Sequence, residues 1–209
     1  MSAVTALSND AIHRGRKYDQ VLAGARHVFM ADGFEGASVD EIARVAEVSK
    51  ATLYKYFPDK SVLFVEVANI ECQRQAVAAL DRIDREAPPR EVLGQTGRHF
   101  LGFVTSKFGQ QMFRICMAES GRFPELGRRF YESGPAVMRS EMAAYFADAC
   151  ARGELEIDDY IMAADQFGEL CKAELWMRLM FGVITEVTLA DIDRVVDNAV
   201  ETFLARYGR

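Results

Sequence analysis

The sequence predicts an all-α protein with a three-helix N-terminal domain and a C-terminal helical bundle. Hydrophobic residues recur at helical spacing, the alternating patterns typical of strands are missing, and β-branched residues are spread thinly. The chain has 209 residues, half of them hydrophobic, which is enough for one large domain or two small ones with a buried core. This ordinary composition excludes a disordered or low-complexity protein.

Each expected helix begins or ends at a residue with a known local effect. The first, about 19–31, ends at Asp32-Gly33, because glycine commonly follows a helix C-terminus. Ser38 and Glu41 have capping-box spacing and open a short helix, about 39–46. Ser49 can cap the next, about 50–56, which Pro58 ends. The later helices are expected at about 60–85, 90–106, 108–119, 124–131, 135–152, 158–182 and 188–207.

The distribution of charge suggests where a polyanion could bind. The first 60 residues contain equal numbers of Lys/Arg and Asp/Glu, so the net charge of -6 arises in the rest of the chain. Residues 1–17 end in a basic segment, His13 to Lys17, and are expected to be a flexible arm. Its basic residues either only make a loose terminus soluble or form an arm that follows the DNA backbone or enters the minor groove. We place the N-terminal domain at 18–64 and the bundle at 65–209.

Cysteine, histidine and hydropathy patterns exclude several other classes. The four cysteines, at 72, 116, 150 and 171, lack CxxC spacing, which indicates reduced thiols in a cytoplasmic protein. The three histidines lack metal-ligand spacing, and neither a metal nor a cofactor is expected. No secretory signal is visible, and no uncharged apolar run approaches the length of a membrane span, so no membrane partner is expected.

Residues 38–57 have the spacing of a helix-turn-helix. Val39, Ile42, Ala43 and Ala46 of the first helix and Leu53 and Phe57 of the second are expected to face inward, with Val48 in the turn. The second helix then presents lysines, a threonine and tyrosines, which suit phosphates and base edges in a major groove. Short helix pairs also occur in ordinary bundles, so the pattern alone leaves this open.

The segment Ser38-Val-Asp-Glu-Ile-Ala-Arg-Val-Ala-Glu-Val-Ser-Lys-Ala-Thr-Leu-Tyr-Lys-Tyr-Phe-Pro-Asp-Lys60 resembles the DNA-binding signature of the TetR/AcrR family of bacterial transcriptional regulators. The match extends over about 18–67. The segment from Glu119 to Leu126, with Phe130-Tyr131 and Gly134-Pro135, resembles the AefR-type branch. One departure is Glu47, where the family usually has glycine. A left-handed backbone there would cost a non-glycine residue roughly 1–2 kcal/mol.

The resemblance implies a helix-turn-helix DNA-binding domain and a bundle for ligand binding and dimerisation. It implies phosphate contacts by Tyr54, Tyr56 and Lys60. The alternative is that the tyrosines are ordinary half-buried residues packed against the first helix and that Lys60 is an ordinary exposed lysine. Lys50 and Thr52 are the best candidates for base edges. Residues expected at the DNA are Ser38, Ser49, Lys50, Ala51, Thr52, Tyr54, Lys55, Tyr56 and Lys60.

The C-terminal part is rich in aromatic residues and methionine, which suit either a plain core or an adaptable apolar pocket. Expected pocket residues are Phe103, Phe113, Met117, Met138, Met142, Phe167, Glu174 and Met177, with His99, Arg114 and Arg178 as further polar candidates. The last two long helices look too apolar for one bundle face, and the resemblance implies dimerisation through them. Expected dimer contacts are Trp176, Leu179, Val183, Val196, Val200 and Phe203.

The leading hypothesis is a ligand-responsive regulator, most often a repressor in this family. It would bind a pseudo-palindromic operator as a homodimer and be released by a small apolar or amphipathic effector. A helical adaptor that binds only protein is the alternative, and it gives no reason for the segment from Thr52 to Lys60. An enzyme is not expected, because no nucleophile motif, phosphate loop or metal motif is found.

Overall fold

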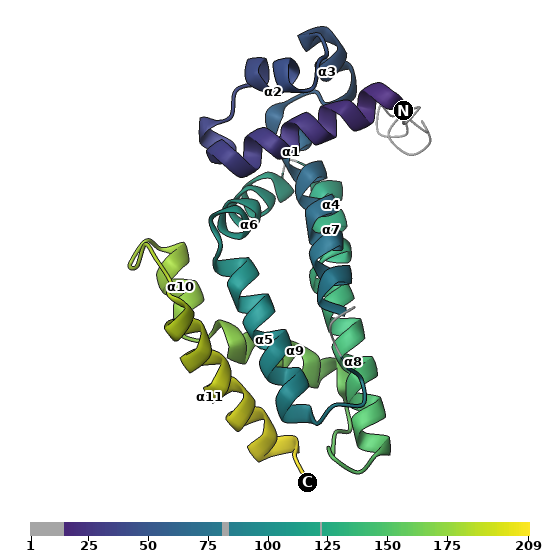
Figure 1. The fold of residues 1–209 in the computed structure, drawn as a ribbon, viewed down its shortest axis with the longest axis vertical. Helices are drawn as coiled ribbons and strands as arrows, with labels where there is room; N and C mark the ends of the chain where they lie inside the picture. Colours follow the sequence, from purple (N-terminus) through teal and green to yellow (C-terminus); the bar gives the residue numbers. More distant parts are fainter. Residues whose placement is uncertain (1–14, 81–83, 122) are drawn as a thin grey trace. The chain divides into compact units, whose positions relative to one another are not determined.

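The computed structural model describes residues 15–80, 84–121 and 123–209, and most of these residues are helical, as predicted (Figure 1). Residues 1–14, the greater part of the expected arm, lie outside the described residues. Apart from an isolated bridge between Leu155 and Gly208, the described ranges contain no β-structure. No helix within them is long and apolar enough to cross a membrane.

The N-terminal unit contains α1 (Arg16–Gly36), α2 (Val39–Val45) and α3 (Lys50–Tyr56). Regular helical geometry in α1 is interrupted at Gly33, whose φ of 72° lies in the left-handed region that glycine tolerates. The expected helix end at Asp32-Gly33 is therefore a kink, and the chain makes a further turn to Gly36. Arg16 and Lys17, expected in the arm, already belong to α1.

The helix α4 (Lys60–Leu80) is continuous across the boundary between the two compact units, which falls after Ala68. The C-terminal unit continues with α5 (Pro89–Thr105), α6 (Lys107–Ser120), α7 (Pro124–Ser133) and α8 (Pro135–Ala151). It ends with α9 (Tyr160–Lys172), α10 (Leu175–Met180) and α11 (Leu189–Tyr207). A proline stands in the first turn of α5, α7 and α8, where its missing amide has no cost.

The core of the C-terminal unit forms where α5, α8, α9 and α11 meet. Phe146 of α8 stacks on Phe203 of α11, and Phe167 of α9 meets Phe203 edge-on. The glycine at position 97 lets α5 approach its neighbours. A Cβ there would lie 2.8 Å from Val196 Cγ1 and 3.1 Å from Cys171 Sγ. This explains one glycine in a helix where glycine is otherwise unfavourable.

The single helix expected over 158–182 is wrong, because the chain breaks at Ala173-Glu174 into α9 and α10. Glu174 has φ 66° and ψ -53°, and the Leu175 amide donates to the Ala173 carbonyl at 2.8 Å. This is a γ-turn of the strained kind. Ion pairs from Glu174 to Arg178 and Arg194 hold it in place. No periodicity signal marks such a turn, since hydrophobic spacing continues through it.

Candidate functional site

Two buried anchors fix the orientation of α3. Leu53 is fully buried and Phe57, at the end of the helix, nearly so. On α2, Ile42, Ala43 and Ala46 are buried, as predicted, whereas Val39 is half-buried. Burying a side chain such as Leu53 or Phe57 stabilises the domain by about 1.5–3 kcal/mol each. The opposite face of α3 is thereby held toward solvent.

Serine side chains begin both short helices, as the sequence predicts. Ser38 Oγ accepts from the Glu41 amide and Ser49 Oγ from the Thr52 amide, each at 3.1 Å. Ser49 Oγ also lies 2.9 Å from Thr52 Oγ1. The second half of the predicted capping box is replaced, because Arg44 binds the Glu41 carboxylate with two donors. Ser49 and Thr52 therefore hold the helix start in addition to any role at DNA.

The solvent face of α3 carries Lys50, Ala51, Tyr54 and Lys55, all exposed. Tyr54 retains 49% of its accessible surface. Lys50 forms an ion pair with Asp40 of α2, so a phosphate or base would compete with that carboxylate. Tyr56 is half-buried, and its ring meets the buried Tyr18 edge-on at 5.6 Å. The arrangement brings donors, cations and one exposed phenol together on a single helix face.

Glu47, in the turn, has a φ of 54°, so the position does adopt the left-handed conformation for which glycine is favoured. The turn nevertheless closes in the usual way, since the Val48 amide donates to the Ala43 carbonyl at 3.0 Å. The chain therefore tolerates strain at this position instead of building a different turn.

Lys60 has partners other than phosphate in this structure. Its ammonium donates to the carbonyls of Phe34, at 2.8 Å, and Ala37, at 3.0 Å, and lies 4.3 Å from the centre of the Phe34 ring. These contacts join the start of α4 to the end of α1. Two of its three ammonium donors are thus already used, which sequence reasoning did not foresee.

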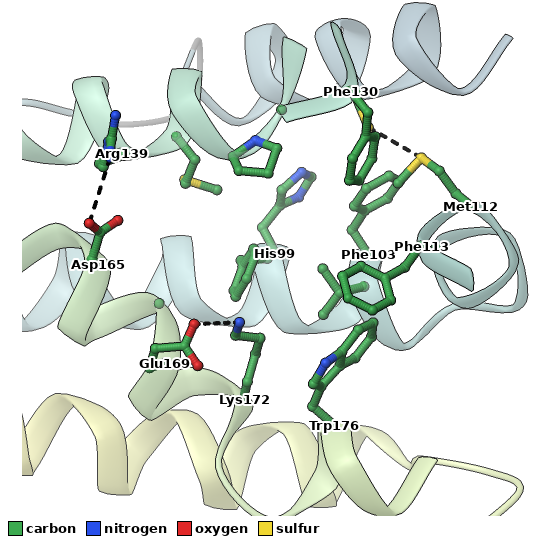
Figure 2. Close-up of a pocket in the computed structure, with 18 of the residues that line it drawn as sticks. His99, Phe103, Met112, Phe113, Phe130, Arg139, Asp165, Glu169, Lys172 and Trp176 are labelled. Carbon is green, nitrogen blue, oxygen red and sulfur yellow. Dashed lines mark hydrogen bonds and ion pairs between the residues drawn. The ribbon is translucent and has the colours of Figure 1, made fainter. Parts of the chain in front are cut away.

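A cavity of about 240 Å³ lies inside the C-terminal unit. It is lined by residues of α4 to α10 (Figure 2). Phe113 and Trp176 form an edge-on pair at 4.9 Å on its wall, and Cys72 Sγ lies 3.3 Å from Met112 Sδ. Two ion pairs, Arg139–Asp165 and Lys172–Glu169, also border it.

Of the expected pocket residues, Phe103, Phe113 and Met138 line this cavity, as does the polar candidate His99. Met142 and Phe167 are instead buried in the core, and Met117 and Met177 are exposed. Glu174, Arg114 and Arg178 also lie off the cavity wall. Glu174 and Arg178 pair with each other, and Arg114 donates to the carbonyls of Leu179 and Met180. Sequence reasoning missed Cys72, Phe130, Pro135, Arg139, Asp165, Glu169 and Lys172.

Most of the expected dimer contacts lie in the interior of the single chain. Leu179, Val196, Val200 and Phe203 are between 0% and 3% exposed and belong to the interior of their own unit. Trp176 is also buried and lines the cavity. Only Val183, 67% exposed, is available to a partner. The outer face of α11 instead carries charged residues such as Asp193, Asp197 and Glu201, which pair with arginines of α5.

Comparison with known proteins agrees with this geometry. Residues 21–67 match the N-terminal domain of bacterial regulatory proteins of the tetR family, and residues 91–209 match the AefR-like transcriptional repressor C-terminal domain. The second match covers more than half of the chain. The protein therefore belongs to the TetR family of DNA-binding transcriptional regulators, which gives no support to the adaptor alternative.

Individual relatives span almost the whole chain. A TetR-family regulator from Mesorhizobium loti superposes with a TM-score of 0.73 at 30% identity, covering 93% of this chain and 98% of that one. The Flavonoid-responsive Regulator FrrA superposes with a TM-score of 0.65 at 35% identity and the same coverage. The transcriptional repressor KstR of Mycobacterium tuberculosis is 25% identical over 97% of this chain and 86% of its own length.

Proposed function

We propose that this regulator is a cytoplasmic repressor that binds a two-fold-symmetric DNA site as a homodimer and is released by a small effector. The observation that carries the proposal is the exposed face of α3, held outward by the buried Leu53 and Phe57. An exposed, rigid helix with cations and a phenol is what major-groove binding requires. The repressor role is supported by the name of the relative KstR.

The residues of α3 divide the work by position. Lys50 and Thr52 are assigned to base edges, Lys50 after leaving Asp40, and Ala51 lets the backbone approach the bases. Tyr54, Lys55 and the half-buried Tyr56 are assigned to phosphates, with the exposed Ser38 and Ser49 adding backbone contacts. Lys60 is assigned a positioning role: its bonds to α1 hold the start of α4, and only its remaining donor can meet a phosphate.

The homodimer is assigned to the corner between α10 and α11. Exposed apolar residues are concentrated there: Met177 (59%), Phe181 (76%), Val183 (67%) and Leu189 (80%). Exposed apolar side chains that cluster in this way are typical of a protein interface. Two-fold pairing would present two α3 helices to successive major grooves, about 34–36 Å apart on DNA.

The effector is assigned to the cavity of the C-terminal unit. The cavity wall includes Cys72 of α4, and α4 is the helix whose first residue binds the end of α1. A ligand that favours one position of α4 would therefore shift the population of DNA-binding states. The similarity to FrrA, a flavonoid-responsive regulator, supports an aromatic effector for this cavity.

The proposal is tested by selection of duplexes from a random pool at about 100–150 mM salt, because phosphate contacts make affinity salt-dependent. The wild type is expected to enrich one site with two-fold symmetry that binds two chains. Tyr54→Ala is expected to lose this enrichment. Tyr131→Ala is the matched control, because Tyr131 is 47% exposed but lies on α7. No enrichment by the wild type would overturn the proposal.

A further inference from the structure

The cavity has two chemically different sides. Figure 2 shows Phe103, Met112, Phe113, Phe130 and Trp176 gathered on one side. The charged groups of Arg139, Asp165, Glu169 and Lys172 are on the other, and the His99 ring lies between them. A ligand that fills the cavity must therefore be amphipathic along its length, with an apolar end that suits aromatic neighbours.

The charged side of the cavity is balanced. Arg139 Nη1 lies 3.8 Å from Asp165 Oδ2, and Lys172 Nζ lies 2.6 Å from Glu169 Oε1. Each cation among the described lining residues thus already has a carboxylate. A ligand carboxylate or a ligand cation would therefore lie near as many negative as positive charges and would gain no net attraction from them. Since a charge entering the cavity also loses its water, this lining favours a neutral ligand.

Two nitrogen atoms at the cavity lack hydrogen-bond partners within the described part of the chain. His99 Nε2 and Arg139 Nε are shielded from solvent and are bonded to no other described residue. A buried polar atom without a partner is unfavourable, and a ligand that supplies the partner gains the corresponding free energy. Oxygen is the ligand atom that suits both. A hydroxyl or carbonyl oxygen accepts from the guanidinium or from an imidazole N–H, and a hydroxyl also donates to an unprotonated imidazole nitrogen.

The volume limits the size of the ligand. An apolar cavity of roughly 150 Å³ holds a benzene molecule. The 240 Å³ available here leaves room for a second ring or an equivalent polar extension. A long acyl chain fits less well than a short rigid body, because flat aromatic walls such as Phe113 and Trp176 pair best with another ring.

We propose that the cavity selects neutral, oxygen-bearing aromatic compounds of about two rings, whose hydroxyl or carbonyl oxygen is bound by His99. The proposal rests on the effector role given to this cavity above and states the chemical class of that effector. His99 is the residue that distinguishes an oxygenated compound from a plain hydrocarbon, and the two ion pairs exclude compounds with a net charge.

The test uses probes that share one two-ring frame and differ only in the substituent. Binding of biphenyl, 4-phenylphenol, biphenyl-4-carboxylate and (biphenyl-4-ylmethyl)trimethylammonium is measured by calorimetry at pH 7, where phenols are ordinarily neutral. The wild type is expected to bind 4-phenylphenol at least tenfold more tightly than either charged probe. His99→Phe keeps a flat ring but removes both ring nitrogens. It is expected to weaken the binding of 4-phenylphenol about three- to tenfold and to leave the binding of biphenyl unchanged.

Charge selection has its own pair of variants. Glu169→Gln leaves Lys172 without its carboxylate and is expected to raise the affinity for biphenyl-4-carboxylate about tenfold. Lys172→Met leaves Glu169 without its cation and is expected to raise the affinity for the trimethylammonium probe instead. Unchanged biphenyl binding in both variants shows that the cavity is intact.

The outcomes separate this inference from the proposed function, because the calorimetry contains no DNA. Wild-type protein that prefers the carboxylate or the cation, or binds none of the four probes, overturns the inference. Equal loss of 4-phenylphenol and biphenyl in His99→Phe also overturns it. If 4-phenylphenol binds as expected but does not release the selected duplex, the ligand class stands and the effector role proposed above fails.

Discussion

Replacing Gly24 with alanine tests how closely α1 approaches the helix-turn-helix. A Cβ at Gly24 would lie 2.7 Å from both Cβ and the amide nitrogen of Ala46, the residue that ends α2. Backbone atoms cannot rotate aside, so α1 and α2 must separate. Overpacking of this kind costs about 1–3 kcal/mol. Alanine in place of glycine inside a helix returns about 1 kcal/mol. The net expectation is a loss of about 0–2 kcal/mol in the free energy of unfolding.

The difference in helix propensity between glycine and alanine can be measured separately at the neighbouring position, Ala23. Ala23 is exposed on the same helix, so Ala23→Gly should cost about 1 kcal/mol and nothing more. Both variants are compared by denaturant unfolding followed by circular dichroism, and by affinity for a selected duplex. Gly24→Ala should also weaken DNA binding, because Ala46 directly precedes the turn that positions α3. Stabilisation of Gly24→Ala by the amount that Ala23→Gly loses, with unchanged DNA affinity, would refute the close-approach argument.

Three further predictions concern strain, assembly and thiol chemistry. Glu47→Gly removes left-handed strain of roughly 1–2 kcal/mol but gives up about 0.5–1 kcal/mol of chain entropy. It should therefore raise the stability by about 0–1.5 kcal/mol in denaturant unfolding, and a loss of stability would contradict the assigned strain. Phe181→Asp should weaken dimerisation in sedimentation equilibrium by about 10- to 100-fold, from the burial of one Phe side chain. An unchanged dimer would place the interface elsewhere. Burial raises the pKa of the Cys72, Cys116 and Cys171 thiols to about 12, whereas Cys150 is only half-buried. Iodoacetamide at pH 8 should thus modify Cys150 first when followed by mass spectrometry, and faster labelling of Cys72 would contradict this order.

The DNA-binding unit could be predicted from sequence almost residue by residue. The capping serines and the inward Leu53 and Phe57 have local causes that a sequence displays. The sequence also marks Glu47 as the departure in the turn but leaves open whether the turn changes or the strain is tolerated. The role of Lys60 could not be predicted, because its carbonyl partners at Phe34 and Ala37 come from a kinked segment more than 20 residues away.

The C-terminal unit shows where sequence periodicity stops being informative. Apolar spacing identifies the helices but does not say which of several apolar faces meets the core, the cavity or a partner. Phe203 and Trp176 are both apolar and both on terminal helices, yet one lies in the core and the other lines the cavity. The break at Glu174 separates α10 from α9, and the hydrophobic spacing does not reveal it. The composition suited either a plain core or an apolar pocket, and only the fold determined which residues line the cavity.

The central claim is that the exposed face of α3 binds DNA, and equilibrium binding to the selected duplex tests it most directly. Fluorescence anisotropy of the labelled duplex would compare wild type, Tyr54→Ala and Tyr131→Ala at one stated salt concentration. We expect Tyr54→Ala to weaken binding at least tenfold and Tyr131→Ala to change it less than twofold. Equal affinity of wild type and Tyr54→Ala, or equal losses in the two variants, would contradict the assignment of α3 to DNA.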